Sequence, residues 1–200
     1  KAERAMYQMA SRVSPVVEQA YHGHLFIDNA GTRRFFGHPV DLAARIKREF
    51  QDRIRLDPIT GLATSKVVSK VGTRLVKPNG FINVAPGNEK RFLEPLSVSL
   101  LPGIGDKLLG RMQGLGIDSM AQLAVLADEY LIAAFGKQGF RLRDYARGLD
   151  KTPVHHCVNN HPKIRAEKVL VPDSNDMTMV RANLHLLVEE TGWMLRSQNQ

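Results

Sequence analysis

The hydrophobic and polar positions repeat with the period of an α-helix in two parts of the chain. Residues 39–54, PVDLAARIKREFQDRI, carry charges on one face and apolar residues on the other, at Val40, Leu42, Ala43, Ile46, Phe50 and Ile54. Residues 66–76, KVVSKVGTRLV, direct apolar side chains to one face, at Val67, Val68, Val71 and Leu75. Because a helix in a folded domain buries an apolar stripe of this spacing, both segments are predicted to be helices.

Extended segments precede both helices. Residues 21–29 end in the apolar run LFID, followed by a Gly-Thr turn, and predict a buried strand. Residues 57–65, DPITGLATS, predict a turn and a short strand. The order strand, helix, strand, helix indicates a sheet that helices cover on at least one side. Residues 77–97 are rich in Pro, Gly and Asn, which predicts a connector with little regular structure.

The second half of the chain has a different character. From residue 100 to residue 150, strand signals vanish and short helices separated by glycines predict a small helical domain. Residues 155–164 indicate a linker, residues 165–171 a strand, and residues 176–198 a long amphipathic helix. Since one strand and one helix cannot bury their own apolar face, we expect the sequence to stop inside a third domain. The predicted domains are residues 1–76, 77–154 and 155–200.

The composition narrows the class of protein. With 200 residues and 43% hydrophobic content, the chain can bury a core. The single cysteine, Cys157, excludes an internal disulfide framework and a Cys-rich zinc pattern. No apolar run is long enough for a bilayer, which needs about 18 residues. The first residues, KAERAMYQMASR, are too charged for a secretory signal. We therefore expect a cytoplasmic protein without a membrane partner.

The charge of the chain is concentrated in one region. The net charge is +8, and residues 33–91 contain 13 Lys or Arg against 5 Asp or Glu. This excess favours a polyanionic partner, although charge alone does not separate DNA from RNA or from anionic lipid. The alternative is a solvated face with ordinary surface lysines.

Residues 99–117, SLLPGIGDKLLGRMQGLGI, have the pattern of a helix-hairpin-helix. Pro102 is predicted to end one short helix, and Asp106 is placed to cap the next one. Gly103 and Gly105 permit a turn that is too tight for side chains. The alternative is a plain helical turn whose glycines serve packing only.

A hairpin of this kind suits a phosphate group. The backbone N–H groups around Gly103, Ile104 and Gly105 can point at a phosphate oxygen, and the following helix adds its positive N-terminus. Lys107 adds a nearby charge. Contacts of this type position a DNA duplex without reading its sequence.

A second turn of the same composition follows in residues 133–150, AAFGKQGFRLRDYARGLD. It places glycines and a lysine at the start of a helix, at Gly136, Lys137 and Gly139, with arginines close behind at Arg141 and Arg143. Two such turns could hold one DNA strand at neighbouring phosphates, and binding would then depend steeply on salt.

With these motifs, the chain resembles the Y-family DNA polymerases of the DinB and UmuC type over almost its whole length. Residues 61–80 resemble the family's palm-to-thumb segment, residues 92–105 the start of its thumb, and residues 135–150 the end of that thumb. The tail resembles the first strand and helix of the little-finger domain. The resemblance implies an α+β fold: a partial palm-type sheet with covering helices, a small all-helical thumb with the helix-hairpin-helix, and the start of a little finger.

The resemblance also assigns the candidate active-site positions. Lys66 falls on the lysine that contacts the triphosphate of the incoming nucleotide. Residues 18–37, EQAYHGHLFIDNAGTRRFFG, align without a gap with the family pattern V-E-x-x-S-I-D-E-A-F-L-D-x-T-G-T-x-R-L-F-G, starting from its glutamate. All four positions of S-I-D-E itself fail to match, where this chain has Tyr21, His22, Gly23 and His24.

These differences concern the metal site of the family. Its phosphoryl transfer depends on two magnesium ions held by carboxylates, and Mg²⁺ prefers oxygen ligands. Gly23 offers no ligand, and His24 offers a nitrogen that Mg²⁺ disfavours. The family's other metal-binding aspartate belongs to an N-terminal motif that does not occur in this sequence, and the single carboxylate of Asp28 cannot hold two metal ions. We therefore expect no catalytic residue, no bound metal and no cofactor in this chain.

Two groups of histidines leave a metal open as an alternative. His22, His24 and Asp28 alternate onto one face of the predicted strand and could bind zinc, although packed or surface histidines are the commoner case. Residues 155–161, HHCVNNH, could bind an adventitious metal, but a linker with exposed histidines is favoured.

The resemblance implies a DNA-binding fragment that acts in translesion synthesis and DNA repair, without polymerase activity of its own. It is similar to the inactive accessory members that act in the damage (SOS) response and recruit other replication proteins. The implied partners are primer-template DNA and a replicative polymerase or sliding clamp, and we expect a monomer. Two alternatives remain: an active polymerase completed by residues outside this sequence, and a generic helix-hairpin-helix repair module with an accidental palm match.

Overall fold

The computed structural model describes residues 2–21, 23–156, 166–170 and 175–198. The chain forms two compact units, Lys1–Cys157 and Val158–Gln200.

The first unit begins with a helix and a β-hairpin. Helix α1 (Ala2–Ala10) leads into strand β1 (Val17–Tyr21), which pairs antiparallel with strand β2 (His24–Ile27). The prediction of a single strand over residues 21–29 is therefore wrong, because the chain reverses between β1 and β2. The reversal contains Gly23, whose φ of 73° favours glycine.

Two helices follow the hairpin, the short α2 (Arg33–Phe36) and the long α3 (Pro39–Ile54). The predicted bounds of the long helix are confirmed. Pro39 occupies its first turn, and the His38 side chain accepts a hydrogen bond from the backbone N–H of Val40 at 3.3 Å. Of the apolar stripe, Leu42 and Phe50 are fully buried.

The next elements form a parallel β-α-β unit. Strand β3 (Thr60–Leu62) and strand β4 (Phe81–Asn83) are parallel neighbours, joined by helix α4 (Lys66–Leu75). The β3 strand and the α4 helix were predicted, but β4 and helix α5 (Glu89–Leu93) lie in the segment expected to have little regular structure. Each is five residues or shorter, too brief to show a hydrophobic period.

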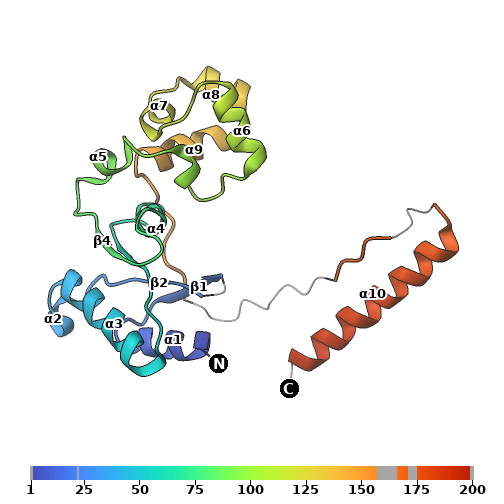
Figure 1. The fold of residues 1–200 in the computed structure, drawn as a ribbon, viewed down its shortest axis with the longest axis horizontal. Helices are drawn as coiled ribbons and strands as arrows, with labels where there is room; N and C mark the ends of the chain where they lie inside the picture. Colours follow the sequence, from blue (N-terminus) through green and yellow to red (C-terminus); the bar gives the residue numbers. More distant parts are fainter. Residues whose placement is uncertain (1, 22, 157–165, 171–174, 199–200) are drawn as a thin grey trace. The chain divides into compact units, whose positions relative to one another are not determined.

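The remainder of the unit is helical, as predicted (Figure 1). It contains the 3₁₀ turn η1 (Val98–Leu100) and the short helices α6 (Asp106–Gly114), α7 (Met120–Ala124), α8 (Asp128–Phe135) and α9 (Gln138–Ala146). Helix α9 packs against α7 and α8. In this part of the chain the described residues make a single isolated β-bridge, between Ser97 and Ser119.

One apolar core connects α4 with these helices. It includes Val67, Val68 and Val71 of α4 together with residues of the helical part such as Leu93, Leu101, Met112, Leu123, Leu131 and Leu142. Leu75, predicted to face inward, is instead 45% exposed because it lies at the last turn of α4. The domain boundaries after residues 76 and 154 stay predictions.

In the second unit, helix α10 (Met177–Gln198) confirms the predicted terminal helix. The described residues 166–170 form no strand, so the strand expected over residues 165–171 is not found there. Several apolar side chains of α10 are exposed, among them Leu184, Leu186, Val188 and Trp193. The assignment of this unit to a little-finger domain stays a prediction. No helix in the described segments has the length and apolar character needed to cross a bilayer.

Candidate functional site

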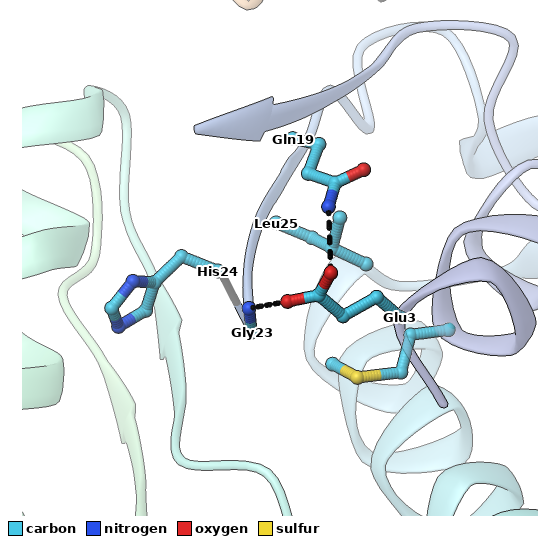
Figure 2. Close-up of a pocket in the computed structure, with 6 residues that line it drawn as sticks. Glu3, Gln19, Gly23, His24 and Leu25 are labelled. Atoms are coloured by element: carbon cyan, nitrogen blue, oxygen red, sulfur yellow. Dashed lines mark hydrogen bonds between the residues drawn. The ribbon is translucent and has the colours of Figure 1, made fainter. Parts of the chain in front are cut away.

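The β1–β2 turn carries the positions that differ from the family pattern, and α1 holds this turn in place. The Glu3 carboxylate accepts hydrogen bonds from the backbone N–H of Gly23 at 2.8 Å and from the Gln19 side chain at 3.4 Å (Figure 2). A Cβ on Gly23 would meet no atom within 4 Å. Its positive φ, and not a lack of space, therefore explains the glycine.

His24 follows this turn and points away from Glu3 (Figure 2). Burial lowers the pKa of its imidazole, and the positive charges of Lys70, Lys77 and Arg74 lower it further. Strand β2 therefore brings its first residue into the electrostatic field of α4 and of the segment after it. The sequence predicted none of these neighbours of His24.

The residues around Gly23 and His24 do not fit Mg²⁺. Gly23 has no side-chain ligand, and its N–H is already used by Glu3. The Asp28 carboxylate accepts a hydrogen bond from the N–H of Ala30 at 2.8 Å and so shapes the turn after β2. In the described part of the chain, no three His, Cys, Asp or Glu side chains are grouped so that they could hold a metal ion. His22 and residues 157–161 of the HHCVNNH segment lie outside the described residues.

Lys66 lies at the first position of α4 and is part of an ion pair. Its ammonium lies 2.7 Å from each carboxylate oxygen of Glu18 on β1, and 3.2 Å from the carbonyl oxygen of Pro153. The Lys66 ammonium also lies 5.1 Å from the centre of the Phe26 ring. A nucleotide at Lys66 would therefore compete with Glu18 for the same ammonium.

Glu18 is held as a carboxylate by these contacts. Burial by itself would raise the pKa of Glu18, but the backbone N–H of His155 and the Lys66 ammonium outweigh burial and lower it below the usual value. The N–H of His155 lies 2.7 Å from the Glu18 carboxylate. Sequence reasoning did not find this cluster, because residues so distant along the chain leave no local signal.

Asp150 is another residue that the sequence did not single out. Its carboxylate accepts a hydrogen bond from the backbone N–H of Val67 at 3.2 Å, in the first turn of α4. The Ser65 side chain accepts from the N–H of Val68 at 3.4 Å in the same turn. The segment that leaves α9 thus returns to the start of α4 and stabilises it.

The predicted helix-hairpin-helix turn lies between η1 and α6. Gly103 has a φ of 85°, which favours glycine, whereas Gly105 has an ordinary φ of −95° and open space at its Cβ position. Gly105 is the N-cap residue of α6 and Asp106 its first helical residue, so the prediction that Asp106 caps this helix is wrong. Ile104 packs against the core, and Lys107 is exposed in the first turn of α6.

The second predicted turn lies between α8 and α9. Gly136 has a φ of 59°, and Lys137 is the exposed N-cap residue of α9. Gly139 is buried inside α9, where an added Cβ would lie 2.8 Å from the carbonyl oxygen of Leu131. Close packing of α9 against α8 accounts for this glycine. The Arg111 side chain of α6 donates to the carbonyl of Ala134 at 3.0 Å, which connects α6 to the end of α8.

Comparisons with known proteins show which sequences this chain is similar to. The family model described as impB/mucB/samB matches residues 1–74. The DNA polymerase IV of Dehalococcoides mccartyi is 30% identical over 190 residues, which are 95% of this chain and 48% of that protein. DNA polymerase IV 2 of Methanosarcina mazei is 32% identical over 173 residues, 86% of this chain and 45% of that protein. The chain spans about half the length of these relatives.

A solved structure shows the same fold. DinB from Sulfolobus solfataricus matches with a TM-score of 0.69 and 24% identity, over 76% of this chain and 46% of that chain. The small sheets with their covering helices are thus the palm region of a Y-family polymerase fold. With the sequence relatives taken together, the chain is a homologue of the DinB-type Y-family DNA polymerases.

Proposed function

We propose that this chain is a DNA-binding part of a Y-family polymerase homologue that acts in translesion synthesis and DNA repair, and that it does not polymerise DNA itself. The homology supports a role in DNA replication and repair. The observation that carries the finer proposal is the β1–β2 turn, where Gly23 and His24 replace the metal-binding carboxylates of the family pattern and Glu3 occupies the N–H of Gly23.

The proposed DNA contact is the turn before α6. Gly103 lets the chain reverse tightly, and the N-cap residue Gly105 has no side chain to accept from the first N–H groups of α6, of which that of Leu108 donates to the Gly105 carbonyl at 3.0 Å. Lys107 is exposed beside them. A phosphate oxygen at this place would be bound by backbone N–H groups and by one cation, which gives affinity without sequence preference. The turn at Gly136 and Lys137 is the proposed second contact.

The proposed DNA contact needs fewer residues than the sequence indicated. Gly139 is buried in the packing of α9 on α8, and its N–H donates to the carbonyl of Gly136 at 3.0 Å. Ile104 supports the hairpin by packing on the core. The exposed cations Lys107 and Lys137 are therefore the side chains expected to contact DNA directly.

For Lys66, the family resemblance and the contacts in the structure indicate different roles. The family resemblance gives it a contact with the nucleotide triphosphate, whereas here its ammonium is shared between Glu18 and Pro153. Binding of a nucleotide at this position requires the ammonium to leave the Glu18 carboxylate. Without paired magnesium ions to recruit the triphosphate, we propose that Lys66 stabilises the fold and does not serve catalysis.

Of the two alternative functions, one is contradicted. A generic helix-hairpin-helix module with an accidental palm match is incompatible with the family match over residues 1–74 and with the palm-type fold. The other, an active polymerase completed by further residues, makes a distinct prediction: primer extension in Mg²⁺ or Mn²⁺.

The proposal of a DNA-binding, non-polymerising chain also includes contacts with a replicative polymerase or a sliding clamp, a monomeric state, a role in the SOS response and a cytoplasmic location.

Two measurements test the proposal. Primer extension by the protein from its complete reading frame, with Mg²⁺ and with Mn²⁺, should give no product; extension that is lost on mutating a carboxylate elsewhere would establish the active-polymerase alternative. Binding of this chain to a labelled primer-template should be independent of sequence and fall steeply with salt. Lys107→Gln should reduce the slope of log K against log salt by about 0.9, the value for one phosphate contact. An unchanged slope would exclude Lys107 from the interface.

A further inference from the structure

Helix α4 presents a row of cations toward an open groove. Lys66, Lys70 and Arg74 are four residues apart and so share one face of the helix. Lys66 is neutralised by Glu18. Among the described residues, neither Lys70 nor Lys77 makes an ion pair, so the positive charge beyond the first turn is not compensated by carboxylates.

The groove has a volume of about 1270 Å³, and His24 of β2, Lys70 and Arg74 of α4, and Lys77 all line it. Thr73 and Asn83 add polar groups to the same lining. The Arg74 guanidinium is fixed at one end by hydrogen bonds to the carbonyls of Leu100 and Leu101, at 3.0 and 2.9 Å. The His24 imidazole on β2 and the cations of α4 and of the segment after it therefore share one accessible space.

The charges in this cluster repel one another. The pKa of Lys70 is lowered by burial and then by the positive charges of Arg74 and Lys77. The pKa of His24 is lowered by burial and then by Lys70, Lys77 and Arg74. Among the described residues, the charges that shift either pKa are all positive. Glu3, the acidic group nearest to the turn, binds the N–H of Gly23 on the side away from the His24 ring (Figure 2). A bound anion would relieve this repulsion.

We propose that His24, Lys70, Arg74 and Lys77 form a binding site for a phosphate-bearing anion that works without a metal ion. In a two-metal site, magnesium ions neutralise the phosphate charge. Here, side chains supply the positive charge, and the described residues contain no group of three His, Cys, Asp or Glu side chains that could hold a metal ion. Divalent metal should therefore weaken binding, because it neutralises the anion before the protein does. This inference does not depend on DNA binding by the turn before α6.

Two sources offer the required chemistry, a free polyphosphate and the phosphodiester backbone of a nucleic acid strand. The experiment is an NMR titration of the chain with the imidazole of His24 as reporter, in EDTA. One arm uses inorganic pyrophosphate and the other a single-stranded oligonucleotide without terminal phosphates. A saturable shift of the His24 signals by pyrophosphate alone assigns a free polyphosphate, and a shift by the oligonucleotide assigns the backbone. No shift in either arm, or a shift that requires Mg²⁺, would overturn the proposal.

Variants identify the cations involved. Lys70→Gln with Lys77→Gln removes two charge-assisted hydrogen bonds and should weaken binding about tenfold or more. Lys90→Gln is the matched control: it removes one charge from the exposed side of α5, outside the groove lining, and should leave binding unchanged. If the double variant fails to fold, Lys77→Gln alone is measured, because Lys77 is exposed. Equal affinity in the folded variants and the control would contradict the proposal.

Discussion

The ammonium of Lys66 lies 2.7 Å from both carboxylate oxygens of Glu18, and these side chains are only 14% and 17% exposed. The pair connects β1 to α4. The backbone of Pro153 and His155 joins the same cluster, so the chain after α9 is fastened to the sheet region. A lysine expected to face a nucleotide thus also holds distant segments of the first unit together.

Glu18→Gln should destabilise the first unit by about 1–3 kcal/mol, because it leaves the poorly solvated Lys66 ammonium without its counter-charge. Urea unfolding monitored by circular dichroism measures the change. Glu94→Gln is the control, since its pair with Lys90 is exposed and 3.7 Å long, and it should cost at most about 0.5 kcal/mol. Equal effects of the two substitutions would mean that the Glu18–Lys66 pair contributes no more to the free energy of unfolding than an exposed pair does.

The contribution of Glu18 should depend on pH. Its pKa is lower in the folded protein than in the unfolded chain, so its stabilisation is complete above the unfolded pKa of glutamate, about 4.3. The stabilisation is lost as the pH falls through the folded pKa. The difference in unfolding free energy between wild type and Glu18→Gln should therefore be constant near neutral pH and shrink in acid. A difference that grows on acidification would contradict the assigned direction of the shift.

Gly139→Ala and Gly105→Ala form a matched pair. The added methyl group at Gly139 meets the carbonyl oxygen of Leu131 at 2.8 Å inside the α8–α9 packing, whereas at Gly105 it meets nothing within 4 Å. We expect Gly139→Ala to cost about 1–3 kcal/mol and Gly105→Ala to be close to neutral. Thermal unfolding of both variants tests this. Similar melting temperatures would show that α9 can move away from α8 without loss of stability.

Gly103→Val should weaken duplex binding for every sequence tested. The φ of 85° at Gly103 is unfavourable for a β-branched residue by about 1–2 kcal/mol, so the turn before α6 must change shape. Fluorescence anisotropy with duplexes of different sequence measures the affinity. Gly114→Ala, at the other end of α6 and with open space around it, is the control. Unchanged affinity in a folded Gly103→Val variant would remove this turn from the DNA contact.

Gly23→Asp combined with His24→Glu should not create a polymerase. A Cβ at Gly23 meets no atom within 4 Å, but the positive φ of Gly23 costs about 1–2 kcal/mol in an aspartate, and Lys70, Arg74 and Lys77 still occupy the surroundings of His24. DNA affinity should stay nearly unchanged where the anion bound near His24 is a free polyphosphate, and should fall where it is the backbone of a strand. Primer extension and anisotropy on the double variant test both statements, and extension in Mg²⁺ would show that these two positions alone silence the site.

Sequence patterns predicted the elements that are long enough to show a period. The bounds of α3 follow from its apolar stripe and from Pro39, and the short helices after residue 100 follow from their glycines. The patterns failed where an element is too brief to show a period, or where its surroundings in the fold determine its structure. Strand β4 has three residues, and residues 21–29 resemble one strand in sequence because a turn of histidines and one glycine is also compatible with extended chain.

The candidate site was predicted only in part. The unusual residues at Gly23 and His24, and the flexible Gly103, were visible because they depart from a pattern or match one. Their surroundings were not visible: the pairing of Lys66 with Glu18, the approach of Lys70 to His24, and the support of α4 by Asp150 all join residues far apart in sequence. Such contacts depend on the tertiary arrangement, which a local pattern does not encode.

The core that joins α4 to the helical part determines where the chain can be cut. A truncated protein that starts at residue 77 would lose Val67, Val68 and Val71 and would leave their partners, Leu101 among them, facing water. One that starts at residue 57 would keep β3, α4 and β4 together with the helices. We therefore expect the helical part to fold on its own only together with this β-α-β unit, and a fragment that starts at residue 77 to expose apolar surface.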